Sequence, residues 1–394
     1  MSTSLPIVRV NRKAGDRLAS GHLWIFASDV VERGEAKPGD VVRIVDGRGR
    51  SLGVAHYSSQ SQITLRLLSR HSEANIDVTF LRGRIEAAQQ LRTQLVHDTT
   101  AYRLVYADGD LLPGLIIDRY SDRFVVQLLD QGMDRLTGEI TSALIDLYSP
   151  AGIVARNDSP VRGKEGLPIE TKVLAGTIPP EVAITMNGLE LGVDLLAGQK
   201  TGIFLDQREN YLAVRRYVQP GARALDCFTA TGGFALHVAK TCESVEAVDS
   251  SAAALEKATD NAAKNGLENI MFQKADVLEY LPGLVGAHRV FDLVVVDPPA
   301  FTKSRESVEG AARGYKEVNL RALRLLRKGG ILVSCSCSHH MTEAHLLEVV
   351  AQAGLDCGKR LRVLERRTQA QDHPILLTMA ETAYLKCLIL QVAD

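Results

Sequence analysis

The sequence has few of the features that mark secreted and membrane proteins. Only six of its 394 residues are cysteine, and none of these forms a CxxC pair. Neither a disulfide scaffold nor an extracellular location is indicated, and reduced thiols in a cytosolic enzyme fit best. The segment Met1–Lys13 lacks the apolar stretch of a secretory signal, and no apolar run approaches the roughly 18 residues that a membrane span needs. We therefore expect a soluble, cytoplasmic protein without a membrane partner.

Charge is also nearly absent at the level of the whole chain, because the formal net charge is only -1 at pH 7. The charge is unevenly distributed, however, since residues 1–72 hold eleven Lys and Arg side chains against six Asp and Glu side chains. A basic module on a mildly acidic remainder is typical of a protein that binds backbone phosphates. An ordinary solvated surface is the alternative.

The chain is too long for one hydrophobic core, since typical domains run to roughly 100–200 residues. Residues 1–72 predict a β-rich, barrel-like unit of short strands, with a hairpin that turns at Asp46-Gly47. Residues 73–190 combine helical periodicity with strand patterns and end in a hairpin that turns at Asn187-Gly188. We expect this second stretch to be an α+β middle domain.

Strand and helix patterns alternate from about residue 200 to the C-terminus, which predicts an α/β domain over residues 191–394. Such alternation is typical of a parallel sheet that helices cover on both faces, as in doubly wound folds. Ligands bind to these sheets at the carboxyl ends of the strands, near the point where the strand order reverses.

Acidic residues follow the first three strand patterns of this domain. Asp226 opens a turn that contains Gly232-Gly233, Asp249 ends the second pattern, and Asp276 follows the third. An acid after the second strand can bond both ribose hydroxyls, and Asp276 is placed to bond an adenine amino group. The motifs GxGxxG and GxxxxGK[ST] are absent, which disfavours NAD and P-loop nucleotides. S-adenosylmethionine is the nucleoside ligand that remains, and a capped turn with incidental acids is the alternative.

The segment ahead of the first strand pattern is unusually polar and contains Asp206, Gln207 and Arg208. Arg208 could pair with the methionine carboxylate of the cofactor in a fork geometry. A helix start capped by Asp206 is the alternative.

The fourth strand pattern ends at Asp297, which two prolines and then Phe301 follow. Two prolines cannot continue a β-ladder, so they stiffen a loop that presents Asp297 at the carboxyl edge. In methyltransferases, an Asp-Pro-Pro or Asn-Pro-Pro element grips a planar amine or a base.

The fifth strand pattern carries Cys335 and Cys337, which alternation places on one face, with Cys337 nearer the tip. Carbon 5 of a pyrimidine is methylated only after a thiolate has added to carbon 6, because that addition makes carbon 5 nucleophilic. Asp297 would bond such a base near N3 and N4. The alternative for Cys337 is a small buried strand residue. A zinc site with His339 and His340 is disfavoured, since ligands so close in sequence do not readily form a tetrahedron.

Together these motifs resemble the bacterial ribosomal RNA large-subunit methyltransferase I family, whose members form 5-methylcytosine. The resemblance covers nearly the whole chain and rests on the segments GHLWIF (21–26), PGDVVRIVDGRGRSLGVAHY (38–57), TGIFLDQREN (201–210), DCFTATGGFALH (226–237), VDPPAFTKSR (296–305), RGYKEVNLRALRLL (313–326) and SCSHHMT (336–342). It implies an RNA-binding PUA β-barrel over 1–72, a small α+β domain over 73–190 and a class I, Rossmann-like methyltransferase domain over 191–394.

The resemblance also implies the activity, which is methyl transfer from S-adenosylmethionine to cytosine carbon 5 in 23S rRNA, with no metal. The resemblance is compatible with a homodimer but does not fix the oligomeric state. Cys337 would be the nucleophile and Asp297 a second catalytic residue. Cofactor contacts are implied for Gln207, Arg208, Asp226, Phe228, Thr231, Gly232, Gly233, Asp249, Asp276 and Asp297. Base contacts are implied for Pro298, Pro299, Phe301 and Lys303.

Three questions stay open at this point. Many RNA cytosine-5 enzymes carry a second cysteine where this chain, like the family it resembles, has Ala300. The group that removes the carbon-5 proton is therefore not identified. Lys303 and His339 are candidates on chemistry alone, and the favoured alternative for both is a solvated surface residue. The target could instead be an exocyclic amine such as guanine N2, with Cys337 as packing. A non-catalytic RNA-binding or assembly factor is the third possibility.

Overall fold

The computed structural model describes residues 5–301 and 308–394. The chain divides into two compact units, and neither of them is continuous in sequence. Unit 1 consists of Met1–Ile184, Val193–Gly202 and Gln371–Thr382, and unit 2 consists of Thr185–Gly192, Ile203–Ala370 and Ala383–Asp394. No helix within the described residues is long and apolar enough to cross a membrane. The predicted division at residues 72 and 190 stays a prediction.

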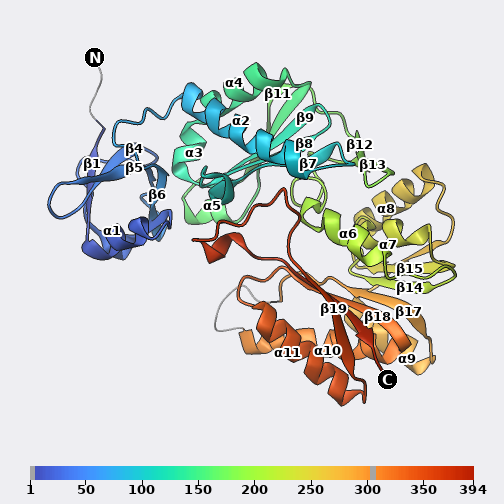
Figure 1. Cartoon of the computed structure of the whole chain (residues 1–394). Coiled ribbons are helices and arrows are strands. Elements are labelled where there is room, and N and C mark those ends of the chain that lie inside the picture. Colours follow the sequence, from blue (N-terminus) through green and yellow to red (C-terminus); the bar gives the residue numbers. More distant parts are fainter. Residues whose placement is uncertain (1–4, 302–307) are drawn as a thin grey trace. The chain divides into compact units, whose positions relative to one another are not determined.

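Unit 1 begins with a six-stranded sheet in the order β2-β6-β5-β4-β1-β3. Its ribbon is drawn in blue in Figure 1. Its strands are β1 (Ile7–Val10), β2 (Trp24–Phe26), β3 (Val30–Glu32), β4 (Val41–Val45), β5 (Ser51–Tyr57) and β6 (Ile63–Ser69). The prediction of strands alone is wrong at helix α1 (Arg12–Ala19), which packs into the same core. Asn11 caps this helix, because its Oδ1 accepts a hydrogen bond from the Ala14 N–H at 2.9 Å.

A five-stranded sheet follows, in the order β11-β10-β9-β8-β7. Its strands are β7 (Ala101–Tyr106), β8 (Leu115–Tyr120), β9 (Arg123–Leu128), β10 (Gly152–Asn157) and β11 (Glu170–Gly176). The helices of this part are α2 (Val78–Leu95), α3 (Gln131–Arg135), α4 (Thr137–Tyr148) and α5 (Val161–Lys164). Helices α2 and α4 share a core with the sheet, in which Ile85 and Ile140 pack with Ile117.

Two segments from later in the sequence complete unit 1. In the segment Gln371–Thr382, Asp372 accepts a hydrogen bond at its Oδ2 from the Arg103 backbone N–H at 2.9 Å. Its backbone oxygen accepts from Arg92 Nη2 at 2.8 Å. In the segment Val193–Gly202, the Thr201 hydroxyl donates to Asp118 at 2.5 Å. Residues that come late in the chain, after Ala370, therefore belong to the same compact unit as the N-terminal residues.

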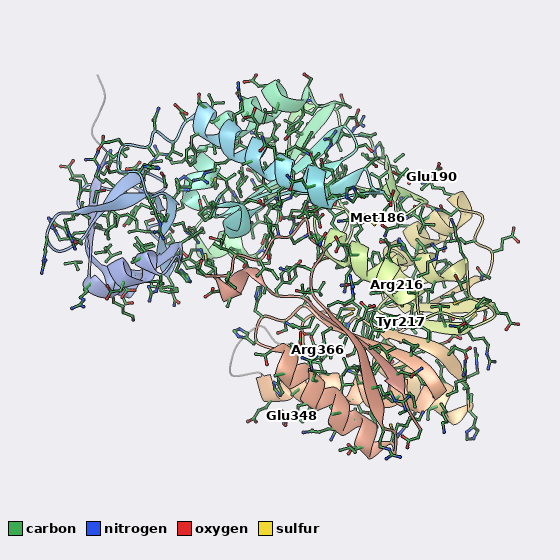
Figure 2. The ribbon with its side chains drawn as sticks, viewed as in Figure 1. Met186, Glu190, Arg216, Tyr217, Glu348 and Arg366 are labelled. Atoms are coloured by element: carbon green, nitrogen blue, oxygen red, sulfur yellow. The ribbon has the colours of Figure 1, made fainter. Side chains whose placement is uncertain are left out.

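A two-stranded hairpin is formed by β12 (Val182–Met186) and β13 (Leu189–Val193), and Figure 2 labels one residue of each strand, Met186 and Glu190. The predicted turn is confirmed, since Asn187 and Gly188 have φ angles of 55° and 77°. Within unit 2 this hairpin docks on α8 (Ala252–Lys264), where Asn261 Oδ1 accepts from the Gly192 N–H at 2.8 Å.

Unit 2 is built on a seven-stranded sheet in the order β16-β15-β14-β17-β18-β20-β19. Its strands are β14 (Arg223–Cys227), β15 (Ser244–Asp249), β16 (Ile270–Lys274), β17 (Phe291–Val296), β18 (Leu326–Ser336), β19 (Leu361–Arg367) and β20 (Lys386–Val392). The strands β14 to β18 are parallel, as predicted, whereas β20 runs antiparallel to both β18 and β19.

Helices cover this sheet on both faces. On one face, α9 (Val277–Gly286), α10 (Val308–Leu325) and α11 (Glu343–Asp356) share a core with the strands, in which Leu281, Tyr315 and Leu346 are buried. On the other face, α6 (Arg208–Arg215) packs on α7 (Gly233–Ala239), and α7 and α8 pack on β15. The predicted doubly wound, Rossmann-like architecture is confirmed.

Candidate active site

Parallel strands bring the predicted site residues to one edge of the seven-stranded sheet. Asp226 is the penultimate residue of β14, Asp249 ends β15, and Asp276 follows β16 by two residues. Asp297 directly follows β17, and Cys337 directly follows β18. The strand order reverses between β14 and β17, which is the point where such sheets bind ligands.

The loop after β14 has an unusual backbone. Phe228 and Ala230 have φ angles of 63° and 49°, and Gly232 has a φ of 85°. Left-handed backbone costs roughly 1 kcal/mol or more for a non-glycine residue and is characteristic of ligand sites. The Ala230 N–H donates to Asp249 Oδ2 at 2.9 Å, so the loop is tied to the end of β15.

Asp226 is a buried carboxylate that the structure only partly satisfies. Its Oδ2 accepts from the Thr229 hydroxyl at 2.6 Å and from the Ala235 N–H at 3.0 Å. Its Oδ1 is buried and has no hydrogen-bond partner within residues 5–301 and 308–394. Burial raises the pKa of Asp226 to about 7, and the charges of Asp297 and Asp249 act in the same direction. A bound cation or N–H donor would give the Oδ1 atom of Asp226 the partner that it lacks among the described residues.

The two glycines of the loop have different roles. Gly232 adopts left-handed backbone, which disfavours any side chain there. A Cβ on Gly233 would lie 2.4 Å from the Tyr211 hydroxyl, so close packing of α7 on α6 requires this glycine. Thr231, the residue directly before Gly232, is half-buried.

Asp249 and Asp276 differ in their surroundings. Asp249 is half-buried, and its Oδ1 accepts from the Ser251 N–H at 2.9 Å. Asp276 is exposed and caps α9 by accepting from the Leu278 N–H at 2.7 Å. Both lie at the predicted edge, and their contacts with a nucleoside stay predictions.

The side chain of Gln207 contacts the Asp-Pro-Pro element, because it reaches Asp297. Its Nε2 donates to Asp297 Oδ2 at 2.9 Å, and its Oε1 accepts from Asn210 Nδ2 at 2.7 Å. Asn210 Oδ1 accepts in turn from Arg367 Nε at 2.8 Å. Arg208 lies beside this chain but is only 3% exposed, and its Nη2 pairs with Glu209 at 3.2 Å.

The Pro-Pro loop rests on α10. Pro298 is buried and Pro299 is exposed, while the Phe301 ring meets the Tyr315 ring edge-on at 4.9 Å. The Tyr315 hydroxyl accepts from the Ser336 hydroxyl at 2.9 Å, and burial raises its pKa to about 12. Lys303 lies outside the described residues.

Cys337 is half-buried and lies just beyond the end of β18, whereas Cys335 is fully buried and paired in register with Cys387 of β20. Lys386, the first residue of β20, lies beside Cys337. Its Nζ donates to the Ser338 and Tyr384 backbone oxygens at 2.5 and 2.6 Å. Burial lowers the pKa of Lys386 to about 8, partly opposed by the charge of Cys337.

Several functional candidates escaped the sequence prediction. Asn210 lies three residues after Gln207, which is the helical spacing that places two side chains on one face and could have found it. Arg367 and Lys386 come from the terminal strand pair, where no motif marked them. No group of three or more His, Cys, Asp or Glu side chains that could hold a metal occurs in the part of the chain that the structure describes.

Some of the basic side chains of the N-terminal sheet form ion pairs within unit 1. Arg17 pairs with the buried Asp29 at 2.6 Å, and Arg66 pairs with Glu165 at 2.7 Å. Arg66 is itself buried, so its charge does not face a nucleic acid.

Known proteins with similar sequences and structures are methyltransferases. Residues 8–70 match the family model of a PUA-like domain, and residues 219–376 match that of a methyltransferase domain. The crystal structure of SMU.776 complexed with SAH, a chain described as a methyltransferase, superposes with a TM-score of 0.85 at 23% identity and covers 98% of this chain and 100% of that one.

Curated relatives share much more of the sequence. The ribosomal RNA large subunit methyltransferase I of Tolumonas auensis is 40% identical and covers 99% of this chain and 100% of its own length. The protein of the same name from Shewanella denitrificans is 39% identical, with 98% and 99% covered. The chain therefore belongs to the ribosomal RNA large subunit methyltransferase I family.

Proposed function

We propose that the protein methylates carbon 5 of a cytosine in 23S ribosomal RNA, with Cys337 as the covalent nucleophile. Its family and its C-terminal fold make it an S-adenosylmethionine-dependent methyltransferase of ribosomal RNA. One observation carries the finer proposal: Cys337 is half-buried at the strand end next to the one that carries Asp297. A cysteine that served only as packing would be expected inside the strand, as Cys335 is.

The residues at the carboxyl edge fit the cofactor. The Asp226 Oδ1, buried without a hydrogen-bond partner among the described residues, is suited to the ammonium group of the methionine moiety. Asp249 would accept from the ribose hydroxyls, and Asp276 from the adenine amino group. When bound, the cofactor supplies an electrophilic methyl carbon on a sulfonium.

The protein's own groups account for the remaining chemistry. The Cys337 thiolate forms a bond to carbon 6 of the base, and the electron pair of the carbon 5–carbon 6 double bond becomes available at carbon 5. Carbon 5 takes up the methyl group and then loses its proton to a base. The double bond reforms as the sulfur–carbon 6 bond breaks, which returns the thiolate. Asp297 holds the base by its 4-position during these steps.

In the proposed mechanism the target base must leave its stack. Its ring must enter between Asp297 and Cys337, which a paired base inside a helix cannot do. Single-stranded loops and partly unfolded regions of RNA offer such bases. We therefore expect the substrate to be a loop or an unfolded segment of the RNA.

Methyl transfer to unmodified ribosomal RNA, followed by mass analysis of the labelled nucleoside, tests the proposal. 5-Methylcytidine is the expected product, whereas N2-methylguanosine would contradict the cytosine assignment. The Cys337→Ala variant should lose turnover by about a thousandfold or more, because it removes the covalent step, while binding of the cofactor measured by calorimetry persists.

Cys357→Ala is the matched control, since Cys357 is also half-buried but lies at the C-cap of α11. It should retain wild-type turnover. Near wild-type turnover of Cys337→Ala would show that the covalent mechanism is wrong.

A further inference from the structure

Four side chains of unit 2 form a hydrogen-bonded chain that ends on the proposed base-binding carboxylate. Arg367 Nε donates to Asn210 Oδ1 at 2.8 Å, Asn210 Nδ2 donates to Gln207 Oε1 at 2.7 Å, and Gln207 Nε2 donates to Asp297 Oδ2 at 2.9 Å. Asn210 and Gln207 are only 1% and 2% exposed. Bulk water therefore does not compete for these bonds, and each is stronger than it would be at the surface.

The donors of this chain can point in only one direction. A guanidinium has donors and no acceptor, so Arg367 requires that Asn210 present its oxygen. The backbone oxygen of Thr368 can only accept, and it accepts from Asn210 Nδ2 at 3.1 Å. Two independent partners thus fix the orientation of the Asn210 amide. Gln207 must then turn its oxygen toward Asn210 and its NH2 group toward Asp297.

The far end of the chain is anchored as well. Arg367 Nη1 donates to Glu365 Oε2 at 2.8 Å. The other carboxylate oxygen of Glu365 accepts from the Tyr217 hydroxyl at 2.7 Å and from Arg216 Nη2 at 3.0 Å. Arg216 and Tyr217 are both labelled in Figure 2, just past the end of α6. The direction of the chain is therefore set by fixed charges and not by a rotatable hydroxyl.

We propose that this chain holds Asp297 as a hydrogen-bond acceptor and thereby makes the enzyme select cytosine over uracil, an inference that rests on the proposed function. An N–H donor stabilises the ionised form of a carboxylate, and an ionised carboxylate can only accept. Cytosine carries an amino donor at its 4-position, whereas uracil carries an acceptor oxygen there. A site built for a donor rejects the analogue that lacks it, because the buried acceptor is then left unpaired.

Asn210 and Gln207 are positioning residues in this scheme, because they act on the base through Asp297. If the amide of Gln207 were reversed, its oxygen would face Asp297 Oδ2. Asp297 would then have to hold a proton on that oxygen to make the same bond. The carboxyl group would become neutral, and the discrimination against uracil would weaken.

Other titratable groups face Asp297 from the surrounding elements. They are Tyr211 of α6, Asp226 of β14, Tyr315 of α10 and Cys335 of β18. Burial raises the pKa of both tyrosines and of Cys335, so these three stay neutral at physiological pH. Asp226, with a pKa of about 7, is the group that titrates near neutrality. Because the charge of Asp297 contributes to the pKa of Asp226, a change at Asp297 also shifts Asp226, so the base preference is read together with the acidic limb in the variants below.

The Asn210→Asp variant tests the direction of the chain with almost no change in shape. Asp at this position still pairs with Arg367 but can only accept, so Gln207 must turn its NH2 group toward it and its oxygen toward Asp297. Two RNAs are compared that carry either cytidine or uridine at the mapped target position. We expect the preference for cytidine to fall about tenfold or more. The acidic limb of the kcat/KM profile should move to higher pH, because Asp297 loses its donor.

Gln207→Glu is a second variant, which removes the same donor without touching Asn210. The matched control is Asn261→Asp, since Asn261 is also buried and accepts a hydrogen bond, but from the Gly192 N–H. It should change neither the base preference nor the acidic limb.

The inference would be overturned if both variants kept the wild-type base preference and the acidic limb of their kcat/KM profiles did not move. It would also be overturned if the variants lost activity equally on the cytidine RNA and the uridine RNA. Neither result would touch the proposed function, which depends on whether the wild-type enzyme makes 5-methylcytidine and on Cys337.

Discussion

Lys386 places a positive charge beside the proposed nucleophile. Its ammonium is half-buried and held by the backbone oxygens of Ser338 and Tyr384. A neighbouring cation favours the thiolate form of a cysteine. The pKa of Lys386 is lowered by burial to about 8, so the ammonium is present below about pH 8 and is lost above it. The ammonium therefore favours the thiolate of Cys337 at neutral pH.

Removal of this charge should make Cys337 less reactive. We expect Lys386→Met to shift the pH midpoint for alkylation of Cys337 by iodoacetamide upward by about one pH unit, the smaller end of the effect of a nearby opposite charge. Peptide mass spectrometry would follow the labelling. Lys359→Met is the control, because Lys359 also donates from a half-buried position to two backbone oxygens, those of Leu323 and Leu326. An equal shift in both variants would argue against a specific role.

The sequence predicts the acids and Cys337 because each of them follows a strand pattern, and parallel strands share their carboxyl edge. It does not predict Lys386, Asn210 or Arg367 as site residues. Arg367 and Asn210 are 157 residues apart in the chain, and they meet because β19 pairs with β20 at the edge of the sheet. A side chain whose role depends on such a long-range contact leaves no local pattern.

His237 connects three elements of unit 2 and must be neutral to do so. Its Nδ1 donates to the Gly233 backbone oxygen at 2.7 Å within α7, and its Nε2 accepts from Asn187 Nδ2 of the hairpin at 3.1 Å. Its ring stacks on Tyr211 of α6 at 4.8 Å. Burial lowers the pKa of His237 to about 4.

This pKa predicts an acid sensitivity of α7 and the hairpin. A histidine in the unfolded chain binds a proton below about pH 6.5, whereas His237 in the folded protein binds one only below about pH 4. The unfolded state therefore binds more protons than the folded state between these two pH values. The free energy of unfolding should therefore fall by about 3 kcal/mol as the pH drops through this window. Hydrogen exchange of the α7 amides would measure it. The His237→Gln variant should lose this part of the pH dependence, and an unchanged slope would contradict the assignment.

At the level of elements, alternating hydrophobic patterns predict the strands of unit 2 and the helices between them. They do not predict that β20 runs antiparallel, because a run of buried residues such as Cys387 to Leu390 has the same pattern in either direction. Helix α1 was missed because it is only eight residues long and lies among strand patterns. Its signal is the capping residue Asn11 and not a long periodicity.

At the scale of the whole molecule, segments from later in the chain complete unit 1. Asp372 is fully buried, accepts from the Arg103 N–H and contacts the His373 ring at 3.1 Å. We expect Asp372→Ala to lower the stability of unit 1 by about 1–3 kcal/mol, since a buried backbone donor loses its partner. Faster hydrogen exchange at Arg103 and its strand β7 would show the loss.

Glu381→Ala is the control for this variant, because Glu381 lies in the same segment and forms a long, partly exposed pair with His22 at 3.6 Å. It should change stability by less than about 0.5 kcal/mol. If the β7 amides of Asp372→Ala were as well protected from hydrogen exchange as those of the wild type, the segment Gln371–Thr382 would not stabilise β7.

The interleaved order of the two units has a consequence for biosynthesis. A nascent chain that has emerged as far as Ala370 holds both sheets of unit 1 but lacks Gln371–Thr382, which supplies the partner of the Arg103 N–H. Domains usually fold in turn as they leave the ribosome. Here the first unit to be translated reaches its final packing only after six strands of the sheet of unit 2, β14 to β19, have also been made, and until then the Arg103 N–H lacks its Asp372 partner.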